Sequence, residues 1–94
     1  MKKVNEEFIG SLIEKYDAGE KFKPEEMDTF YCEHEDGTYT ACYNTGGDAY
    51  CEDFKSITGV ILYLESSLAV EECMELEKKI NGYLKNIIIN QLMS

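Results

Sequence analysis

The chain has 94 residues, a formal net charge of -10 and 44% apolar residues, which excludes a disordered polymer and predicts one small folded domain over residues 1–94. No stretch approaches the ~18 apolar residues that a membrane-spanning helix requires, and the basic start Met1-Lys2-Lys3 has no apolar signal region behind it. We therefore expect a cytoplasmic protein that does not bind membranes. In that reducing compartment the four cysteines are expected to be thiols.

The negative charge is concentrated in the middle of the chain. Residues 24–77 contain fourteen acidic residues and a single lysine, Lys55, which gives this segment a local charge of -13. Residues 78–94 carry three lysines and no acid. Such a field repels nucleic acids and attracts basic protein surfaces. We therefore expect a partner with a basic surface, such as a nucleic-acid-binding protein, and no direct binding to nucleic acid.

Apolar residues recur every three or four positions at the start of the chain and predict an amphipathic helix over residues 5–17, which Gly19 ends. The connection that follows contains Pro24, which can begin one short helical turn. The first part of the chain is thus predicted to be helix and then loop.

Residues 29–54 are rich in aromatic, β-branched and cysteine residues, and two turn signals interrupt them. Asp36-Gly37 is typical of a two-residue hairpin turn, and residues 44–48 supply two further glycines. We predict an antiparallel meander of three strands, over residues 29–35, 38–44 and 49–54.

The predicted turns set the register of this sheet. A two-residue first turn places Cys32 opposite Ala41, and a symmetric second turn places Cys42 opposite Cys51. A glycine bulge in the second turn is the alternative and would shift the third strand by one residue. The expected core face carries Phe30, Cys32, Tyr39, Ala41, Tyr43, Tyr50 and Phe54. The expected acidic, solvated face carries Tyr31, Glu33, Glu35, Thr38, Thr40, Cys42, Cys51 and Asp53.

Two helices are predicted after the sheet. Ser56 can cap a helix over residues 57–64, although Gly59 and the β-branched residues leave a fourth strand over 58–64 as the alternative. Ser66-Ser67 can cap a last helix, which Asn81-Gly82 would end or kink. The predicted fold class is α+β, with an N-terminal helix, a three-stranded antiparallel meander and two C-terminal helices.

The cysteines and the single histidine are the candidate metal ligands. Cys32 and His34 share one face of the predicted sheet, but the predicted register turns Cys42 and Cys51 to the opposite face, and Cys73 lies on a helix. We therefore predict no metal site and no cofactor, and we keep a zinc or thiol module as a third hypothesis. Cysteine that packs as a small apolar residue is the simpler interpretation.

Motifs of catalysis are missing from the sequence. It has no arginine, no Gly-x-Ser-x-Gly, no phosphate-binding glycine loop and one histidine. Neighbouring carboxylates such as Glu52 and Asp53 point to opposite faces of a strand. We predict that the protein is not an enzyme and has no catalytic residues.

The acids of the sheet and its turns are the candidate binding residues. Carboxylates about 6.6 Å apart on one strand face repel one another, and no lysine lies within residues 29–54 to offset them. Their presence suggests a cation supplied by a partner, and the interleaved tyrosines suit a protein interface. The predicted partner-binding residues are Glu33, Glu35, Asp36, Asp48, Glu52, Asp53 and Tyr31.

In its acidity and its element order, a helix, a three-stranded sheet and two helices, the chain resembles the small acidic anti-CRISPR proteins of phages. Its segment NTGGDAYCEDF is also similar to a hairpin found in short bacterial and phage proteins. The resemblance implies a nucleic-acid mimic, an inhibitor that occupies the basic nucleic-acid-binding site of a CRISPR effector or another nucleic-acid enzyme. The alternative is a homodimeric accessory or regulatory domain that uses exposed tyrosines or the tail Ile87-Ile88-Ile89.

Overall fold

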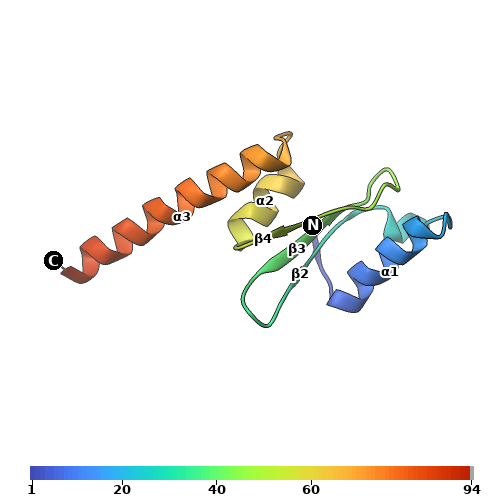
Figure 1. Ribbon diagram of the computed structural model, residues 1–94, viewed down its shortest axis with the longest axis horizontal. Coiled ribbons are helices and arrows are strands. Elements are labelled where there is room, and N and C mark those ends of the chain that lie inside the picture. The colour runs from blue at the N-terminus through green and yellow to red at the C-terminus, as the bar shows by residue number, and fades with distance from the viewer. Residues whose placement is uncertain (94) are drawn as a thin grey trace.

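Figure 1 shows the computed structural model of the protein, which describes residues 1–93. The elements are β1 (Lys2–Lys3), α1 (Glu6–Asp17), the short 3-10 helix η1 (Pro24–Glu26), β2 (Thr29–Glu33), β3 (Tyr39–Tyr43), β4 (Tyr50–Phe54), α2 (Ile57–Glu65) and α3 (Val70–Met93). The predicted α+β class is confirmed. The predicted layout is matched in part, because the sheet has an additional strand and a different register.

The strands form one mixed sheet in the order β1-β2-β3-β4. Strands β2, β3 and β4 are antiparallel and correspond to the predicted meander, whereas β1 adds a parallel edge in which Lys3 pairs with Tyr31. The Val4 N–H extends this edge and donates to the Tyr31 carbonyl at 2.8 Å. The prediction of three strands was incomplete because a pair of lysines carries no strand signal of its own.

The register between β2 and β3 differs by one residue from the prediction. Cys32 lies opposite Thr40, not Ala41. Alternate residues of a strand face opposite sides of the sheet. A shift of one residue between β2 and β3 therefore means that residues of β3 predicted to share a face with Cys32 lie on the opposite face. The predicted pairing of Cys42 with Cys51 is confirmed, so the second hairpin has the expected register.

The cause of the shift is the length of the first hairpin loop. The His34 N–H donates to the Thr38 carbonyl at 2.8 Å, which leaves three loop residues, and the last of them, Gly37, has a φ of +84°. A turn followed by one left-handed residue is a common form of three-residue hairpin loop. Asp36-Gly37 correctly indicated a hairpin but did not distinguish a loop of two residues from a loop of three.

Helices cover both faces of the sheet, so the predicted division into a core face and a solvated face was wrong. Helix α1 lies on one side of the strands, and α2 lies on the other (Figure 1). The core under α1 is made of Ile9, Leu12, Phe30, Cys32 and Cys42. The core under α2 is made of Ala41, Phe54, Val60, Leu64 and Cys73.

Three side chains show this error most clearly. Cys42 was expected on the solvated face and is completely buried under α1. Tyr43 and Tyr50 were expected in the core and are 40% and 60% exposed. They form the last pair of β3 and β4, next to the second hairpin loop, where the sheet ends.

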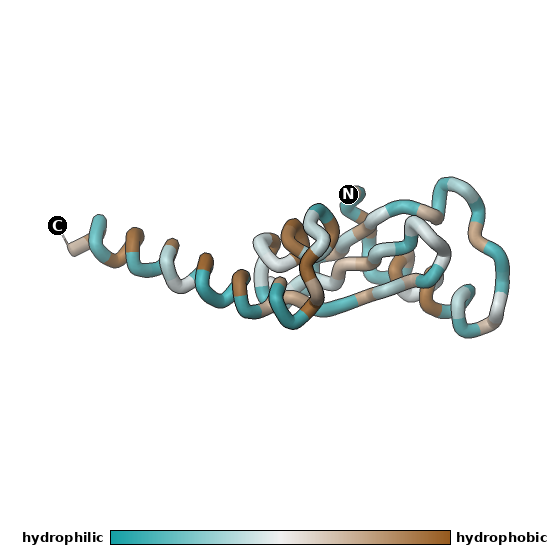
Figure 2. The backbone as a smooth tube through the Cα atoms, turned by 90° about the horizontal axis from the view of Figure 1, so that it is seen from above, coloured by the Kyte–Doolittle hydropathy of each residue, from teal (hydrophilic) through white to brown (hydrophobic). Residues whose placement is uncertain are grey.

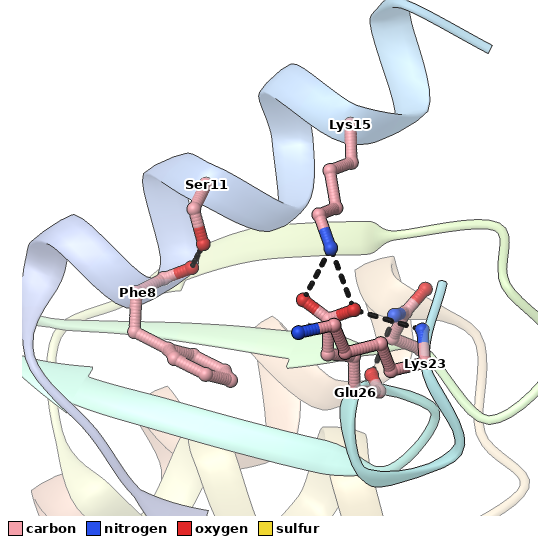
Figure 3. Close-up of polar contacts among 6 residues, drawn as sticks. Phe8, Ser11, Lys15, Lys23 and Glu26 are labelled. Carbon is pink, nitrogen blue, oxygen red and sulfur yellow. Dashed lines mark hydrogen bonds and ion pairs between the residues drawn. The ribbon is translucent and has the colours of Figure 1, made fainter. Parts of the chain in front are cut away.

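Helix α1 is fixed at both ends, and Figure 3 shows the contacts near its C-terminal end. At its start, the Asn5 side chain accepts the Phe8 N–H at 2.9 Å and caps the helix. Near its end, Lys15 donates to both carboxylate oxygens of Glu26 at 2.7 and 2.9 Å, and the Lys23 N–H donates to the same carboxylate at 2.8 Å. The bonds from Lys15 and Lys23 hold the pKa of Glu26 below its usual range. These contacts tie α1 to η1 and so to the sheet.

Residues 57–65 form a helix, which excludes the alternative of a strand there. The Ser56 side chain makes no cap hydrogen bond to α2. Instead, the buried carboxylate of Glu77 on α3 accepts the Ser56 N–H at 3.0 Å and the Ser56 hydroxyl at 2.8 Å, at the end of the helix that attracts negative charge. Gly59 makes room for this contact, because a Cβ there would lie 2.6 Å from Phe54 and 2.8 Å from the Glu77 carboxyl carbon.

Helix α3 continues through Asn81-Gly82 and does not end there. Its first turns pack against α2, and residues 80–93, which we call the arm, project from the rest of the protein (Figure 1). The radius of gyration of 15.5 Å exceeds the value of about 12 Å expected for a compact chain of this length. Within residues 1–93, no helix combines the length and the apolar character needed to cross a bilayer.

Candidate functional site

Exposed carboxylates gather at the end of the sheet where β2 turns into β3. They come from the first turn of α1, from the hairpin and from β4, and we call them the acidic end: Glu6, Glu7, Glu33, Glu35, Asp36 and Asp53. Two open depressions of about 560 and 400 Å³ adjoin this end, and both are lined by Glu6 and His34. In the part of the chain that the structure describes, Lys3 is the one lysine paired with the acidic end, 3.6 Å from Glu33.

His34 lies between two of these carboxylates. Its Nδ1 bonds to a carboxylate oxygen of Glu6, and its Nε2 lies 2.7 Å from the Thr40 Oγ1. The Thr40 hydroxyl in turn donates to Asp53 at 2.5 Å. The hydrogen bond to Glu6 raises the pKa of His34 above its usual value, partial desolvation opposes this, and the charges of Glu6, Asp53 and Asp36 add to the rise. We call these four side chains, Glu6, His34, Thr40 and Asp53, the histidine clasp.

The histidine clasp is suited to holding elements together rather than to catalysis. An imidazolium donates from both ring nitrogens, so charged His34 donates to Glu6 and Thr40 while Thr40 donates to Asp53. A histidine that activates a hydroxyl must be neutral at the nitrogen that faces it, and the raised pKa favours the opposite state. The clasp joins α1 to β3 and β4, and a single imidazolium leaves most of the negative charge of the acidic end in place.

Two thiols lie beside the clasp under α1. Cys32 and the half-buried Cys51 line the same depression as His34. The Cys42 thiol donates a hydrogen bond to Cys51, which lowers the pKa of Cys51 and raises that of Cys42. Burial raises the pKa of Cys32. These thiols, together with Cys73, are free.

The observed register brings the three cysteines of the sheet to one face, whereas the prediction separated them. Cys32, Cys42 and Cys51 all pack on the side of α1. Within residues 1–93, however, no three cysteine, histidine or carboxylate side chains are arranged to hold a metal ion. Cys32 and Cys42 pack with Ile9 and other apolar side chains, as small core residues do.

Five of the predicted partner-binding acids lie at or beside the acidic end. Glu33, Glu35 and Asp36 line the larger depression, and Glu52 and Asp53 line the smaller one. They meet because the first hairpin loop and the last residues of β4 lie at the same end of the sheet, as the pairing of β2 with β3 and of β3 with β4 requires.

The structure places the other two predicted residues elsewhere. Asp48 is exposed in the loop between β3 and β4, at the opposite end of the sheet. Tyr31 is half-buried on the face covered by α2, where its ring lies 6.4 Å from that of Tyr39. Neither adjoins the acidic end.

Sequence reasoning missed Glu6, Glu7 and Thr40. The two glutamates follow the Asn5 cap in the first turn of α1. Acids are common there because they stabilise the start of a helix, so nothing in the sequence assigned them to a binding site. Their place beside the hairpin depends on the parallel pairing of β1 with β2, which was not predicted. Thr40 could have been found, because the predicted register of the second hairpin already sets it opposite Asp53.

Comparison with protein-family models, with curated proteins and with solved structures gives no match to this chain. The function must therefore be inferred from the geometry and the charge of the acidic end.

Proposed function

We propose that the protein is a non-enzymatic inhibitor that places its acidic end in the basic nucleic-acid-binding site of another protein. The observation that carries this proposal is the convergence of exposed carboxylates from three elements around His34, where Lys3 is the one lysine of residues 1–93 that pairs with the acidic end. Carboxylates at this density repel one another, and a partner surface of lysines and arginines relieves that repulsion.

The tip of the acidic end is also ordered before any partner arrives. The Thr38 N–H and hydroxyl both donate to Asp36, at 3.0 and 2.6 Å. These bonds, led by the one from the hydroxyl, hold the pKa of Asp36 below its usual range, so this carboxylate stays ionised. A preorganised charged loop loses less conformational entropy on binding than a flexible one.

A site that evolved to bind phosphates is the basic surface most suited to this end. Such sites present several lysines and arginines that bind a row of negative charges, and carboxylates on three adjacent elements offer a similar row. CRISPR effector nucleases are the first class of target to test, because the chain resembles anti-CRISPR proteins in element order and charge. Other nucleases and polymerases are the second class.

Charge reversal tests this proposal. The double variant Glu7→Lys, Glu35→Lys changes two exposed members of the acidic end. The matched control, Glu25→Lys with Asp48→Lys, changes the net charge equally but at the opposite end of the sheet. Inhibition of a panel of purified CRISPR effectors, nucleases and polymerases is measured for all three proteins. We expect the first variant to inhibit at least about tenfold less strongly, a loss of about 1.4 kcal/mol, and the control to match the wild type.

The mechanism of occupancy has its own readout. Added nucleic acid should displace the protein from the inhibited enzyme, and inhibition should weaken as the salt concentration rises. If both double variants lose inhibition equally, net charge and not the acidic end is responsible. If the inhibited enzyme still binds its nucleic acid, or if no enzyme of the panel is inhibited, the proposal is wrong.

A further inference from the structure

The arm of α3 carries an apolar ridge that no other segment covers within residues 1–93. Ile80, Leu84, Ile88 and Leu92 recur at every fourth position and are 37%, 48%, 58% and 81% exposed. Residues four apart are neighbours on a helix surface, so these side chains form one continuous ridge. Figure 2 shows brown apolar segments alternating with teal polar ones along the arm.

The ridge continues a buried side of the same helix. Cys73, seven residues before Ile80, is completely buried in the core under α2. A helical segment as short as the arm is marginal in water without packing, and most helices in proteins are stabilised by the face that they bury. The arm is therefore built to pack against another surface.

The sequence of the ridge is symmetric about position 86. Ile80 and Leu92 lie six residues on either side of it, and Leu84 and Ile88 lie two residues on either side. When two such helices run in opposite directions, Ile80 of each meets Leu92 of the other, and Leu84 meets Ile88. Ridges with a spacing of four residues pack together at a crossing angle of about 50°.

The charges on α3 also favour this antiparallel pairing. Helix α3 has no basic residue in its last turn, so its carbonyl end lacks a nearby cation among the described residues. In the reversed pairing, Lys78 and Lys79 of one copy lie beside the last turn of the other copy, where a positive charge is stabilising. A parallel pair would instead bring two strongly acidic bodies side by side.

We infer that the arm binds the arm of a second copy of this chain in an antiparallel crossing. The protein is then a homodimer in which the two bodies, residues 1–79 of each copy, lie at opposite ends. A membrane surface is a less suitable occupant, because Lys85 is the only charged residue of the arm, whereas helices that lie on membranes are usually rich in basic residues. This inference is independent of the proposed inhibitory function.

The mass of the full chain in solution tests the inference. Light scattering at tens of micromolar should give twice the 10.8 kDa of one chain for the wild type and a monomer for Ile88→Glu. The matched control is Asn86→Glu, an exposed position two residues from both Leu84 and Ile88 and so about 160° around the helix from each of them. It should remain a dimer. Circular dichroism and the thermal midpoint of the body check that both variants are folded.

Cross-linking tests the direction of the helices. Leu84→Cys and Ile88→Cys are prepared separately, mixed and oxidised. In the antiparallel dimer, a disulfide forms between position 84 of one variant and position 88 of the other. Because trypsin cleaves after Lys85, digestion then releases one peptide that contains position 84 joined to a different peptide that contains position 88. A monomeric wild type, a monomer that sediments with anionic lipid vesicles, a dimer that Ile88→Glu leaves intact, or links that join 84 to 84 would each overturn the inference.

Discussion

The two hairpin loops of the sheet are built in opposite ways. The loop between β3 and β4 is organised from the inside by Asn44, which is completely buried, donates to the Glu26 carbonyl at 2.7 Å and accepts the Ala49 N–H at 2.9 Å. The loop between β2 and β3 is organised at the surface, by the exposed Asp36 and by His34. The β3–β4 loop uses its polar groups to hold the fold, whereas the β2–β3 loop keeps its carboxylates available to a partner.

This contrast separates acids that the sequence treats alike. Asp48 and Glu35 both lie in hairpin loops of the structure, and both are exposed. Only Glu35 belongs to a loop surrounded by other carboxylates, so only Glu35 is expected to contribute to a strong local field. The position of an acid relative to the sheet matters more here than its exposure.

The largest effect on stability is expected in the β3–β4 loop, which the buried Asn44 side chain organises. Asn44→Ala removes two hydrogen bonds and leaves the Glu26 carbonyl and the Ala49 N–H without these partners, at a cost of about 2–4 kcal/mol in the free energy of unfolding. Urea denaturation measures this loss. The exposed neighbour Thr45→Ala is the control and should cost less than about 0.5 kcal/mol. Equal costs at the two positions would remove the contrast between the loops.

A smaller effect on stability is expected in the β2–β3 loop. Gly37 has a φ of +84° with open space around it, so Gly37→Ala meets no atom and costs only the backbone strain, about 1 kcal/mol. Gly37→Asn should cost less, because asparagine tolerates this conformation better than alanine does. Both are measured by urea denaturation. A cost for Gly37→Ala above that of Asn44→Ala would show that the first hairpin, not the second, holds the fold.

The histidine clasp gives a pH dependence that the Asn44 loop lacks. The pKa of His34 is raised in the folded protein, so its contribution to stability is complete below about pH 6.5, the unfolded value, and is lost as the pH rises through the folded pKa. His34→Gln should therefore destabilise more at about pH 5.5 than at about pH 9. The difference should stay below about 1 kcal/mol, because the Glu6 partner is exposed. The loss caused by Asn44→Ala should not change with pH, and a pH-independent loss for His34→Gln would exclude the clasp.

The smallest effect concerns the carboxylates themselves. Glu35→Lys should raise the free energy of unfolding by a few tenths of a kcal/mol at low salt, because it relieves repulsion within the acidic end. Asp48→Lys should leave it unchanged. Thermal unfolding at two salt concentrations measures both, and the gain should shrink as salt screens the charges. A loss of stability in Glu35→Lys would mean that this residue serves the fold rather than a partner.

The parts of the fold that local patterns determine were predictable. The helical period around Ile9 and Leu12 and the turn signals on either side of β3 indicated the right classes of element. The register of β2 was not predictable, because Asp36-Gly37 fits a loop of two residues or three, and one residue exchanges the two faces. Strand β1 depends on an open edge far along the chain, which no local pattern reports.

The candidate site divides in the same way. Carboxylates in the first hairpin and in β4 were identified from their spacing along the strands and from the lack of lysines among them. Glu6 and Glu7 join them through the pairing of β1 with β2, which sets the start of α1 beside the hairpin. The role of His34 becomes visible only from its contacts with Glu6 and Thr40. Spacing and composition do not predict such contacts between segments that are distant in the sequence.

The carboxylate of Glu77 has a consequence for the order in which the chain folds. Helix α2 begins at Ile57, directly after Ser56, yet the carboxylate that binds Ser56 lies 21 residues after it in the chain. During synthesis from the N-terminus, α2 emerges before its cap exists, and an uncapped helix of nine residues is marginal by itself. The second half of the molecule should therefore fold as one unit, in a late step that waits for α3, and a chain released before Glu77 should leave one face of the sheet bare and prone to aggregate.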